Sequence, residues 1–455
     1  MPTHRGASTG RSHRGAHAEM LHPARLIVLA FAAVIAIGTV LLSLPLAVRG
    51  DGAVNVLTAL FTTTSAVCVT GLTVVDTATH WSGFGHGVIL VLIQIGGLGI
   101  TVFGAILAYT VSSRVGIRMR MAAQSETQTA AGDLRTLLKG VAVFVVGTEA
   151  VLAIVLAARF WWSADEPALR AVWLGIFHSV SAFNNAGFAL FPDNLVPFAT
   201  DLWITTPIMI GIILGGIGIP VVMELRRNVR RPAQWSVHTK LTVLTSVVLL
   251  ATGFAVILAL EWSNTLGAFG TFDKASAALF QSVSPRTAGF NTVDYSQMHE
   301  STWFFTSILM FIGAGSASTA GGIKVSTFAL LGFVLWSELR TTGEVTAFRR
   351  RMPTEVQRQA VTVALLSIAL VVAATMVLIT FDDFALIRVL FEVCSAFGLV
   401  GLTTGITAQM DGIGQLLLVA LMFVGRIGPA TLGVALVLRE RPTRVRYAED
   451  RPLIG

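Results

Sequence analysis

The chain has 455 residues, of which 54% are hydrophobic and only 13% are charged. Soluble domains carry about 25% charged residues, so this composition excludes an ordinary soluble protein. A length of this size would allow about three globular domains in water. The more useful unit here is an apolar run of about 20 residues, which crosses the hydrocarbon core of a bilayer. Many such runs and a mean hydropathy of +0.75 predict a polytopic membrane protein.

The formal net charge is +7, from 32 Lys and Arg against 25 Asp and Glu. In a soluble protein this excess would suggest nucleic-acid binding. Here the basic residues lie in short segments between apolar runs, so we predict no nucleic-acid partner. Two cysteines, Cys68 and Cys394, are too few for a disulfide framework or a paired zinc site. Residues 1–24 contain no signal-peptide core and are predicted to form a disordered basic cytoplasmic arm.

Eight apolar runs are long enough to cross a membrane, and a shorter run lies between the members of each successive pair. The predicted spans are, in chain order, 26–48, 87–111, 137–158, 202–223, 241–260, 303–336, 361–381 and 416–438. The shorter runs are 54–69, 168–182, 275–283 and 384–396. Each shorter run is followed by a glycine-containing turn, which is typical of a re-entrant half-helix buried in protein or lining a watery cavity.

These runs form four predicted units, each made of a helix, a re-entrant pore loop and a helix. The predicted pore repeats are 25–113, 135–227, 237–340 and 356–440, and a cytoplasmic tail follows at 441–455. Most Lys and Arg residues lie in 5–25, 114–139, 226–240, 340–358 and 439–451, whereas acidic residues gather between these segments. Because positive residues remain on the cytoplasmic side, we expect both termini in the cytoplasm and the half-helices to enter from outside.

One sequence pattern accompanies each of the four short runs. The copies read SAVCVTGLT (65–73), SAFNNAGFA (181–189), VSPRTAGFNT (283–292) and SAFGLVGLTT (395–404). They align on Gly71, Gly187, Gly289 and Gly401, and a second glycine element follows at Gly96, Gly215, Gly313 and Gly425. A single glycine often makes only a tight turn, but two linked elements repeated four times indicate a common structure.

Four such units around one axis would bring four glycine-containing strands face to face. Glycine permits positive φ, and backbone carbonyl groups can then replace the hydration shell of a monovalent cation. The predicted selectivity filter, which would hold potassium, consists of Val69, Thr70, Gly71, Asn185, Ala186, Gly187, Thr287, Ala288, Gly289, Leu399, Val400 and Gly401. The predicted fold class is thus an all-α polytopic membrane protein with one pseudo-fourfold ion pore.

Four stretches of the sequence resemble a known family. These are TTSAVCVTGLTVVDT (63–77), SVSAFNNAGFAL (179–190), SVSPRTAGFNTVD (282–294) and STAGGIKVST (318–327). They are similar to motifs of the Trk/Ktr/HKT superfamily of cation transporters, and the resemblance extends over about residues 25–440. With eight expected spans and no additional N-terminal pair, the chain resembles the membrane subunit of a bacterial Ktr-type potassium uptake system.

The resemblance implies potassium uptake across the bacterial plasma (inner) membrane by a homodimer in which each protomer has its own pore. It also implies a cytosolic regulatory ring of RCK domains that binds a nucleotide, ATP/ADP or NAD, whereas this chain holds no cofactor. Whether sodium acts as an activator is left open. A sodium or non-selective monovalent cation transporter of the same superfamily is the alternative, since serine at the first filter position of the family favours sodium.

Two features inside apolar runs predict a gate. Arg426, in VGRIGPATL, stands where the other repeats have Gly97, Gly216 and Ala314, and an arginine at membrane depth is a functional candidate. The run from 313 to 324 is rich in small residues with poor helix propensity and should interrupt its helix, although small residues also permit close helix packing. The resemblance implies a gating loop here and a pore arginine below the filter. The predicted gate comprises Gly313, Gly315, Ser316, Ser318, Thr319, Ala320, Gly321, Gly322, Lys324 and Arg426. Ala317 departs from the family, which usually has glycine there.

Other readings receive less support from the sequence. Glu149, Arg286 and Glu392 are ionisable groups near membrane depth, and Arg286 could pair with Glu392 or with an outer acid. An intramembrane enzyme would need a catalytic set on facing helices, but the adjacent acids Asp382 and Asp383 lie at a helix end, and no HExxH or GxxxxGK[ST] motif occurs. We therefore predict that the chain is not an enzyme. A secondary transporter with inverted repeats would show two halves of opposite topology.

Overall fold

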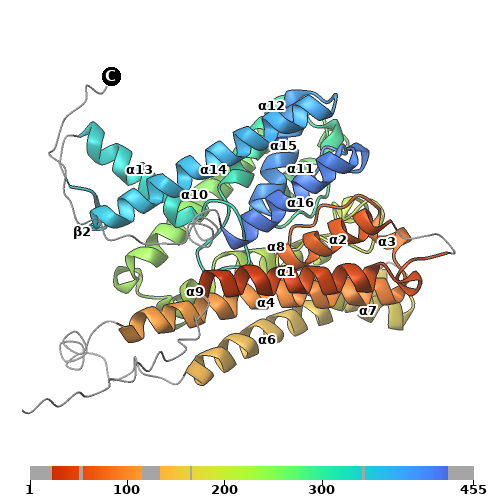
Figure 1. The fold of residues 1–455 in the computed structure, drawn as a ribbon, viewed down its shortest axis with the longest axis horizontal. Coiled ribbons are helices and arrows are strands. Elements are labelled where there is room, and N and C mark those ends of the chain that lie inside the picture. The colour runs from red at the N-terminus through yellow and green to blue at the C-terminus, as the bar shows by residue number, and fades with distance from the viewer. Residues whose placement is uncertain (1–22, 51–54, 115–133, 164–165, 341–343, 429–455) are drawn as a thin grey trace, which may run out of the picture.

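The computed structural model describes residues 23–50, 55–114, 134–163, 166–340 and 344–428 (Figure 1). These residues are mainly helical, and the short antiparallel strands β1 (Thr346–Ala347) and β2 (Arg350–Arg351) form a hairpin. The first helices are α1 (Pro23–Leu42), α2 (Val56–Cys68), α3 (Thr77–His80), α4 (Gly83–Arg114), α6 (Leu134–Ser163), α7 (Ala168–Phe183), α8 (Leu202–Gly216) and α9 (Ile219–Asn228). The remaining helices are α10 (Val237–Glu261), α11 (Thr271–Val283), α12 (Glu300–Phe311), α13 (Val325–Leu339), α14 (Thr354–Phe381), α15 (Leu386–Gly398) and α16 (Gly412–Ile427). Single 3-10 turns lie at Pro45–Ala47, Val196–Phe198, Pro232–Gln234, Tyr295–Gln297 and Thr407–Gln409.

Within the described residues, three helices are long and apolar enough to cross a bilayer: α6 over 139–162, α10 and α14. The bent pair α8 and α9 would be a fourth candidate. Large apolar side chains are exposed along these helices; Ile154 is 69% exposed, Val247 57% and Leu365 62%. Water-soluble monomers rarely expose such continuous apolar surface, so these faces are suited to contact with lipid.

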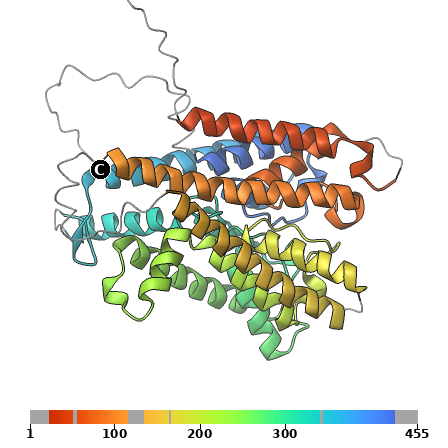
Figure 2. The same cartoon turned by 90° about the horizontal axis from the view of Figure 1, so that it is seen from below.

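The short helices α2, α7, α11 and α15 correspond to the four predicted half-helices, which confirms that these segments are helical. Each packs against the helix that follows the preceding short helix: α7 against α4, α11 against α8, α15 against α12, and α2 against α16. The last of these contacts joins the end of the described chain to its beginning. These contacts connect the four short helices in closed cyclic order through the longer ones, and all four lie in the same half of the molecule (Figures 1 and 2).

Two predicted spans are interrupted by glycine. The span expected over 202–223 is wrong as a continuous helix, because α8 ends at Gly216 and α9 leaves it at 102°. Gly218, at the bend, has φ 94°, and Pro220 has no amide hydrogen with which to continue the helix. The same arrangement ends α16: Gly428 has φ 87°. The helix predicted over 416–438 is thus broken at Gly428, and its remaining part lies outside the described residues.

The interruption predicted in the third repeat is confirmed. α12 ends at Phe311 and α13 begins at Val325, and residues 312–324 between them are not helical. Smaller differences concern helix ends: α1 begins at Pro23, within the predicted arm 1–24, and α11 begins four residues before the predicted 275. Most of the arm, and the tail 441–455, lie outside the described residues.

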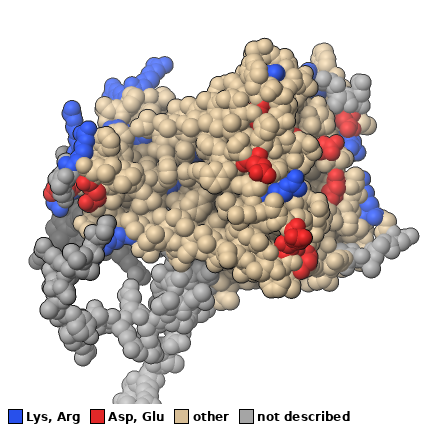
Figure 3. All heavy atoms as spheres, turned by 90° about the horizontal axis from the view of Figure 1, so that it is seen from above, with Lys and Arg blue, Asp and Glu red and all other residues tan. Residues whose placement is uncertain are grey.

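Charged side chains are sparse on the long faces of the molecule. On the face drawn in Figure 3, Lys and Arg gather at one end together with a few acidic atoms, and the other end carries most of the visible acidic atoms mixed with basic ones. Several acids have local structural roles, because Asp201 and Asp411 accept hydrogen bonds from the first turns of α8 and α16. Such N-caps fix where a helix begins. Asp201 and Asp411 therefore have a structural role in addition to their charge.

Candidate ion-conduction site

Four short turns follow the four short helices, and they share one backbone pattern. In each predicted filter trio the first residue has positive φ: Val69 58°, Asn185 60°, Thr287 77° and Leu399 56°. The third residue also has positive φ: Gly71 91°, Gly187 71°, Gly289 74° and Gly401 93°. A non-glycine residue in this region is uncommon. Because the same unusual backbone conformation occurs in all four turns, the turns are copies of one structural motif.

The four turns contact one another in a closed ring. A Cβ atom placed on Gly71 would overlap the carbonyl oxygen of Ala186, the middle residue of the second trio. The same relation holds from Gly187 to the oxygen of Ala288, from Gly289 to that of Val400 and from Gly401 to that of Thr70. The structure thus brings the twelve predicted filter residues together. A side chain at any of the four glycines would press on a backbone carbonyl group of the next turn.

A serine at or near the end of each short helix fixes the turn that follows. Ser65 and Ser395 accept hydrogen bonds from the amides of Gly71 at 3.0 Å and Gly401 at 3.1 Å. Ser181 donates to the carbonyl of Phe188 at 2.8 Å, and Ser284 donates to that of Phe290. These serines were not predicted as site residues, although three of the four repeated motifs begin with one of them. Their recurrence was the signal that could have identified them.

Polar side chains nearer the N-terminal ends of the short helices form hydrogen bonds with the extended segments that follow the turns. Glu392 accepts hydrogen bonds from Thr403 Oγ1 at 2.7 Å, the Thr404 amide at 2.8 Å and Thr407 Oγ1 at 2.6 Å. On α7, the His178 ring lies 2.8 Å from the Leu174 carbonyl through Nδ1 and accepts from the Leu190 amide at 3.3 Å through Nε2. These contacts assign the two residues a bracing role rather than direct contact with an ion.

Arg286 bonds to none of its expected acidic partners. Its guanidinium donates to the Ser246 carbonyl and to Ser246 Oγ, both at 3.0 Å. The suggested pairing with Glu392 is therefore wrong. The Glu392 carboxylate accepts its hydrogen bonds from threonine hydroxyls and a backbone amide instead. Arg286 joins the third turn to α10, the helix that precedes α11.

The second glycine element lies directly behind the turns. A Cβ atom on Gly96 would overlap the carbonyl of Val67, which lies two residues before the first filter trio. The equivalent pairs are Gly215 with Phe183 and Gly425 with Phe397. In the third repeat, Gly313 instead faces the carbonyl of Gly321. The difference arises because segment 312–324 folds back between these elements. The glycines allow outer helices and short helices to approach at backbone distance.

The predicted gating loop, residues 313–324, lies against two other repeats, the second and the fourth. The Gly315 amide donates to the Gly216 carbonyl at 2.8 Å, and a Cβ on Gly321 would overlap Leu399 of the fourth turn. The loop is closed at its base, where the Ile323 amide donates to the Phe311 carbonyl at 3.1 Å. Ser318 Oγ donates to the Gly315 carbonyl at 2.6 Å inside the loop. The loop is therefore ordered by its own hydrogen bonds and by those to repeat two.

Two basic side chains hold consecutive carbonyl groups of this loop. Arg426, only 3% exposed, donates to the carbonyl of Thr319 and to that of Gly96, the latter at 2.6 Å. Lys324 donates through Nζ to the carbonyl of Ala320. No described acid forms an ion pair with either residue. Arg426 thus connects the fourth repeat to the loop of the third and to α4 of the first.

The departure at Ala317 has a measurable consequence. Ala317 has φ 55°, a left-handed conformation that costs a non-glycine residue about 1–2 kcal/mol. Ala317→Gly should remove that strain. Glycine also makes the unfolded chain more flexible, which costs about 0.4–1 kcal/mol. We therefore expect the free energy of unfolding to rise by about 0.5–1 kcal/mol. Thermal unfolding of the purified protein in detergent measures the change. Ala320→Gly is the control, since φ is not positive there, and equal stabilisation by both substitutions would contradict the explanation.

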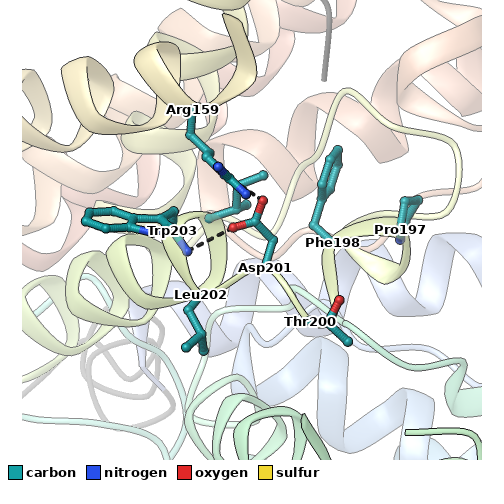
Figure 4. Close-up of a pocket in the computed structure, with 8 residues that line it drawn as sticks. Arg159, Pro197, Phe198, Thr200, Asp201, Leu202 and Trp203 are labelled. Carbon is teal, nitrogen blue, oxygen red and sulfur yellow. Dashed lines mark hydrogen bonds and ion pairs between the residues drawn. The ribbon is translucent and has the colours of Figure 1, made fainter. Parts of the chain in front are cut away.

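A cleft of about 540 Å³ lies away from the ring, beside the N-terminal end of α8 (Figure 4). Asp201 there accepts from Arg159 Nε at 2.8 Å and from the Trp203 amide at 3.0 Å. Arg159 and Asp201 neutralise each other, and Asp201 already caps α8. The cleft therefore has a structural explanation and is not part of the candidate ion path.

Comparison with known proteins agrees with this arrangement. The model of the TrkH family, described as cation transport protein, matches residues 7–443. The chain is 38% identical to Ktr system potassium uptake protein B of Bacillus subtilis (strain 168), over 95% of this chain and 97% of that protein. It is 33% identical to the potassium/sodium uptake protein NtpJ of Enterococcus hirae, over 96% and 98% of the two chains.

The crystal structure of the potassium transporter TrkH from Vibrio parahaemolyticus has the same fold, with a TM-score of 0.73 at 19% identity, covering 94% of this chain and 87% of that one. The family model spans nearly the whole chain, and relatives above 30% identity cover it almost completely. The predicted resemblance is therefore confirmed: the chain belongs to the TrkH family of cation transport proteins.

Proposed function

We propose that this chain is the membrane subunit of a potassium uptake system and that potassium passes through the ring of four turns. The observation that carries the proposal is the cyclic contact of Gly71, Gly187, Gly289 and Gly401 with the carbonyl groups of neighbouring turns. Rings of backbone carbonyls can replace the hydration shell of a monovalent cation. Two relatives named as potassium uptake proteins, at 38% and 37% identity, support potassium as the transported ion.

The test is ion flux through the purified protein in proteoliposomes. With a potassium gradient we expect uptake, and with an equal sodium gradient much less. The second candidate, a sodium or non-selective cation transporter, is favoured by the relative named potassium/sodium uptake protein. Equal rates for the two ions would support that candidate and contradict potassium selectivity. Adding sodium on either side of the membrane would reveal whether sodium activates potassium flux.

In the proposed architecture, four helix–pore loop–helix units form eight spans around one pore, and the short helices enter from outside. Both termini would then face the cytoplasm of a bacterial plasma (inner) membrane. The N-caps Asp201 and Asp411 begin α8 and α16, the helices that return from the predicted outer side. Attaching membrane-impermeant labels to cysteines introduced at Thr200 and at Arg230 would test this orientation, because only the first should react from outside.

We further propose that segment 312–324 and Arg426 form the gate on the cytoplasmic side of the filter. The loop contacts the fourth turn through Gly321 and Leu399, and Arg426 holds the loop through the Thr319 carbonyl. In this arrangement the loop and a positive charge obstruct a cation that leaves the ring. Movement of the loop away from the ring would open the path.

Regulation is proposed to come from a separate cytosolic ring of RCK domains, bound to a homodimer of this chain. Relatives named as protein B of a Ktr system support a multi-subunit assembly. The sequence has no phosphate-binding GxxxxGK[ST] motif, so nucleotide should bind to the partner. We therefore expect no nanomolar binding of ATP, ADP or NAD to this subunit alone in equilibrium dialysis. Tight nucleotide binding without a partner would contradict this assignment.

A further inference from the structure

A buried polar cluster lies behind the second turn, apart from the proposed ion path and gate. Its members are Glu149 on α6, Gln94 on α4, and Asn184 at the end of α7. Glu149 is 7% exposed and Asn184 is 1% exposed. Buried carboxyl groups need a counter-charge, a full set of hydrogen-bond donors or a proton. The contacts of Glu149 distinguish among these three possibilities.

Glu149 has no described cationic partner. Among the residues whose side chains the structure describes, the charged and titratable groups on α6 and on the helices packed against it are Lys139, Arg159, His86, Arg170 and His178, with Asp201 at the start of α8. Lys139 and Arg159 are ten residues from Glu149, about 15 Å along the helix. Arg159 pairs with Asp201 and Arg170 with Glu166. His86 Nε2 lies 2.8 Å from the Thr77 carbonyl, and His178 bonds to Leu174 and Leu190.

Arg426 reaches the same region from α16. Its terminal nitrogens are directed to the carbonyls of Gly96 and Thr319. Arg426 therefore donates its hydrogen bonds to α4 and to the loop rather than to the Glu149 carboxyl group.

The cluster also offers too few hydrogen-bond donors to satisfy an ionised Glu149 carboxylate together with its other acceptors. Asn184 Nδ2 lies 2.9 Å from Glu149 Oε1, 3.0 Å from Gln94 Oε1 and 2.9 Å from the Val180 carbonyl. A side-chain amide has two hydrogens, which cannot serve three acceptors fully. Turning the amide would place its oxygen against the same three acceptors, so this orientation is the favourable one. The remaining bond to the carboxyl group comes from Gln94 Nε2 at 3.2 Å.

Two other buried carboxylates, Glu392 and Glu261, receive more hydrogen-bond donors. Glu392 receives separate hydrogens from Thr403, Thr404 and Thr407. Glu261 receives them from Asn264 Nδ2, Thr265 Oγ1, the His299 amide and Thr302 Oγ1. Several donors stabilise a charged carboxylate in a protein interior. Unlike these two, Glu149 has one shared donor and one long one, and its surroundings suit the neutral acid.

We propose that Glu149 is a proton-binding site that holds the second turn in its observed conformation. A proton on the Glu149 carboxyl group removes its uncompensated negative charge and leaves Asn184 Nδ2 free to serve the Gln94 and Val180 oxygens. When the O–H bond breaks, the proton leaves to water and its electron pair remains as a carboxylate charge, which draws the Asn184 amide toward itself. Asn184 immediately precedes Asn185, the left-handed first residue of the second filter trio. Loss of the proton therefore disturbs that turn.

Infrared difference spectroscopy tests proton binding without requiring transport, so its failure is distinct from failure of the proposed potassium function. The intact wild-type protein should show the C=O stretching band of a protonated carboxylic acid in mildly acidic and neutral buffer, and the band should disappear as the pH rises. Glu149→Gln should lack the band, and the matched control Glu392→Gln should retain it. If Glu149→Gln does not fold, Gln94→Leu serves instead, since it should shift the band without removing it. Absence of the band in the wild type, or its loss in Glu392→Gln alone, would overturn the proposal.

Potassium flux gives a second readout. Wild-type flux should fall several-fold from neutral to alkaline pH, because deprotonation disturbs the second turn. Glu149→Gln, which stays neutral at all pH values, should show a flat profile over the same range. A wild-type-like pH profile in Glu149→Gln would contradict the role of this proton. Loss of sodium sensitivity in that variant without any acid band in the wild type would identify a cation site instead and would also overturn the proposal.

Discussion

Gly71→Ser should lower potassium flux and raise sodium permeation relative to potassium. Gly71 has φ 91°, and a Cβ atom there would overlap the carbonyl oxygen of Ala186, a backbone atom that cannot move without its turn. A side chain in left-handed backbone costs about 1–2 kcal/mol, which corresponds to about a 5- to 30-fold change in an equilibrium. We expect a change of that size in the potassium-to-sodium ratio, measured as paired ion fluxes in proteoliposomes.

The control for this substitution is Gly87→Ser on α4, where an added Cβ would have no neighbour within 4 Å. It introduces the same side chain without pressing on the ring and should leave selectivity unchanged. Gly401→Ser should resemble Gly71→Ser, because Gly401 faces the Thr70 carbonyl in the equivalent way. An unaltered ion preference in both ring variants, with normal folding, would show that the ring does not select the ion.

Arg426→Ala should raise potassium flux and make it less dependent on the cytosolic partner. A cation about 4 Å from the guanidinium meets about 4 kcal/mol of repulsion at an effective dielectric of 20, a ceiling of about a thousandfold in rate. The substitution also removes the hydrogen bonds to the Thr319 and Gly96 carbonyls and so frees the loop. We expect an increase of about tenfold, measured as potassium or rubidium flux with and without the partner.

Arg426→Lys separates the two contributions to this effect. Lysine keeps the charge but lacks the planar fork that reaches two carbonyl groups, so its flux should lie between those of the wild type and Arg426→Ala. Shortening the loop between Gly313 and Lys324 should raise flux in the same direction. Folded variants with unchanged flux and unchanged regulation would leave the gate without support. Size-exclusion profiles and thermal unfolding establish that each variant is folded.

The general character of the molecule could be predicted from properties that act locally along the chain. Hydropathy depends on composition alone, so the long apolar helices α6, α10 and α14 were identifiable directly. The small-residue run from 313 to 324 lowers helix propensity where it stands, and its interruption of the helix followed. The four glycines recur in similar sequence surroundings, and each proved to have positive φ, a conformation that glycine adopts without steric cost.

Helix bends and helix ends were harder to predict from the sequence. The segment 202–223 is apolar throughout, and hydropathy does not register the turn at Gly218 or the 102° change of direction after it. Gly428, which also has positive φ, ends α16. Both could have been suspected from glycine followed closely by proline, but an apolar average over a window of 20 residues conceals such a pair.

What the sequence alone determined was the membrane character, the fourfold glycine pattern and the residues at which the backbone turns. Only the tertiary structure decided which polar group meets which, because a buried hydrogen bond depends on packing between segments that are remote along the chain. Arg426 binds carbonyl groups of Thr319 and Gly96, 107 and 330 residues away, and Arg286 binds Ser246 rather than an acid. Glu149 is left short of donors for the same reason: the helices that surround it place two amides there and no positive charge.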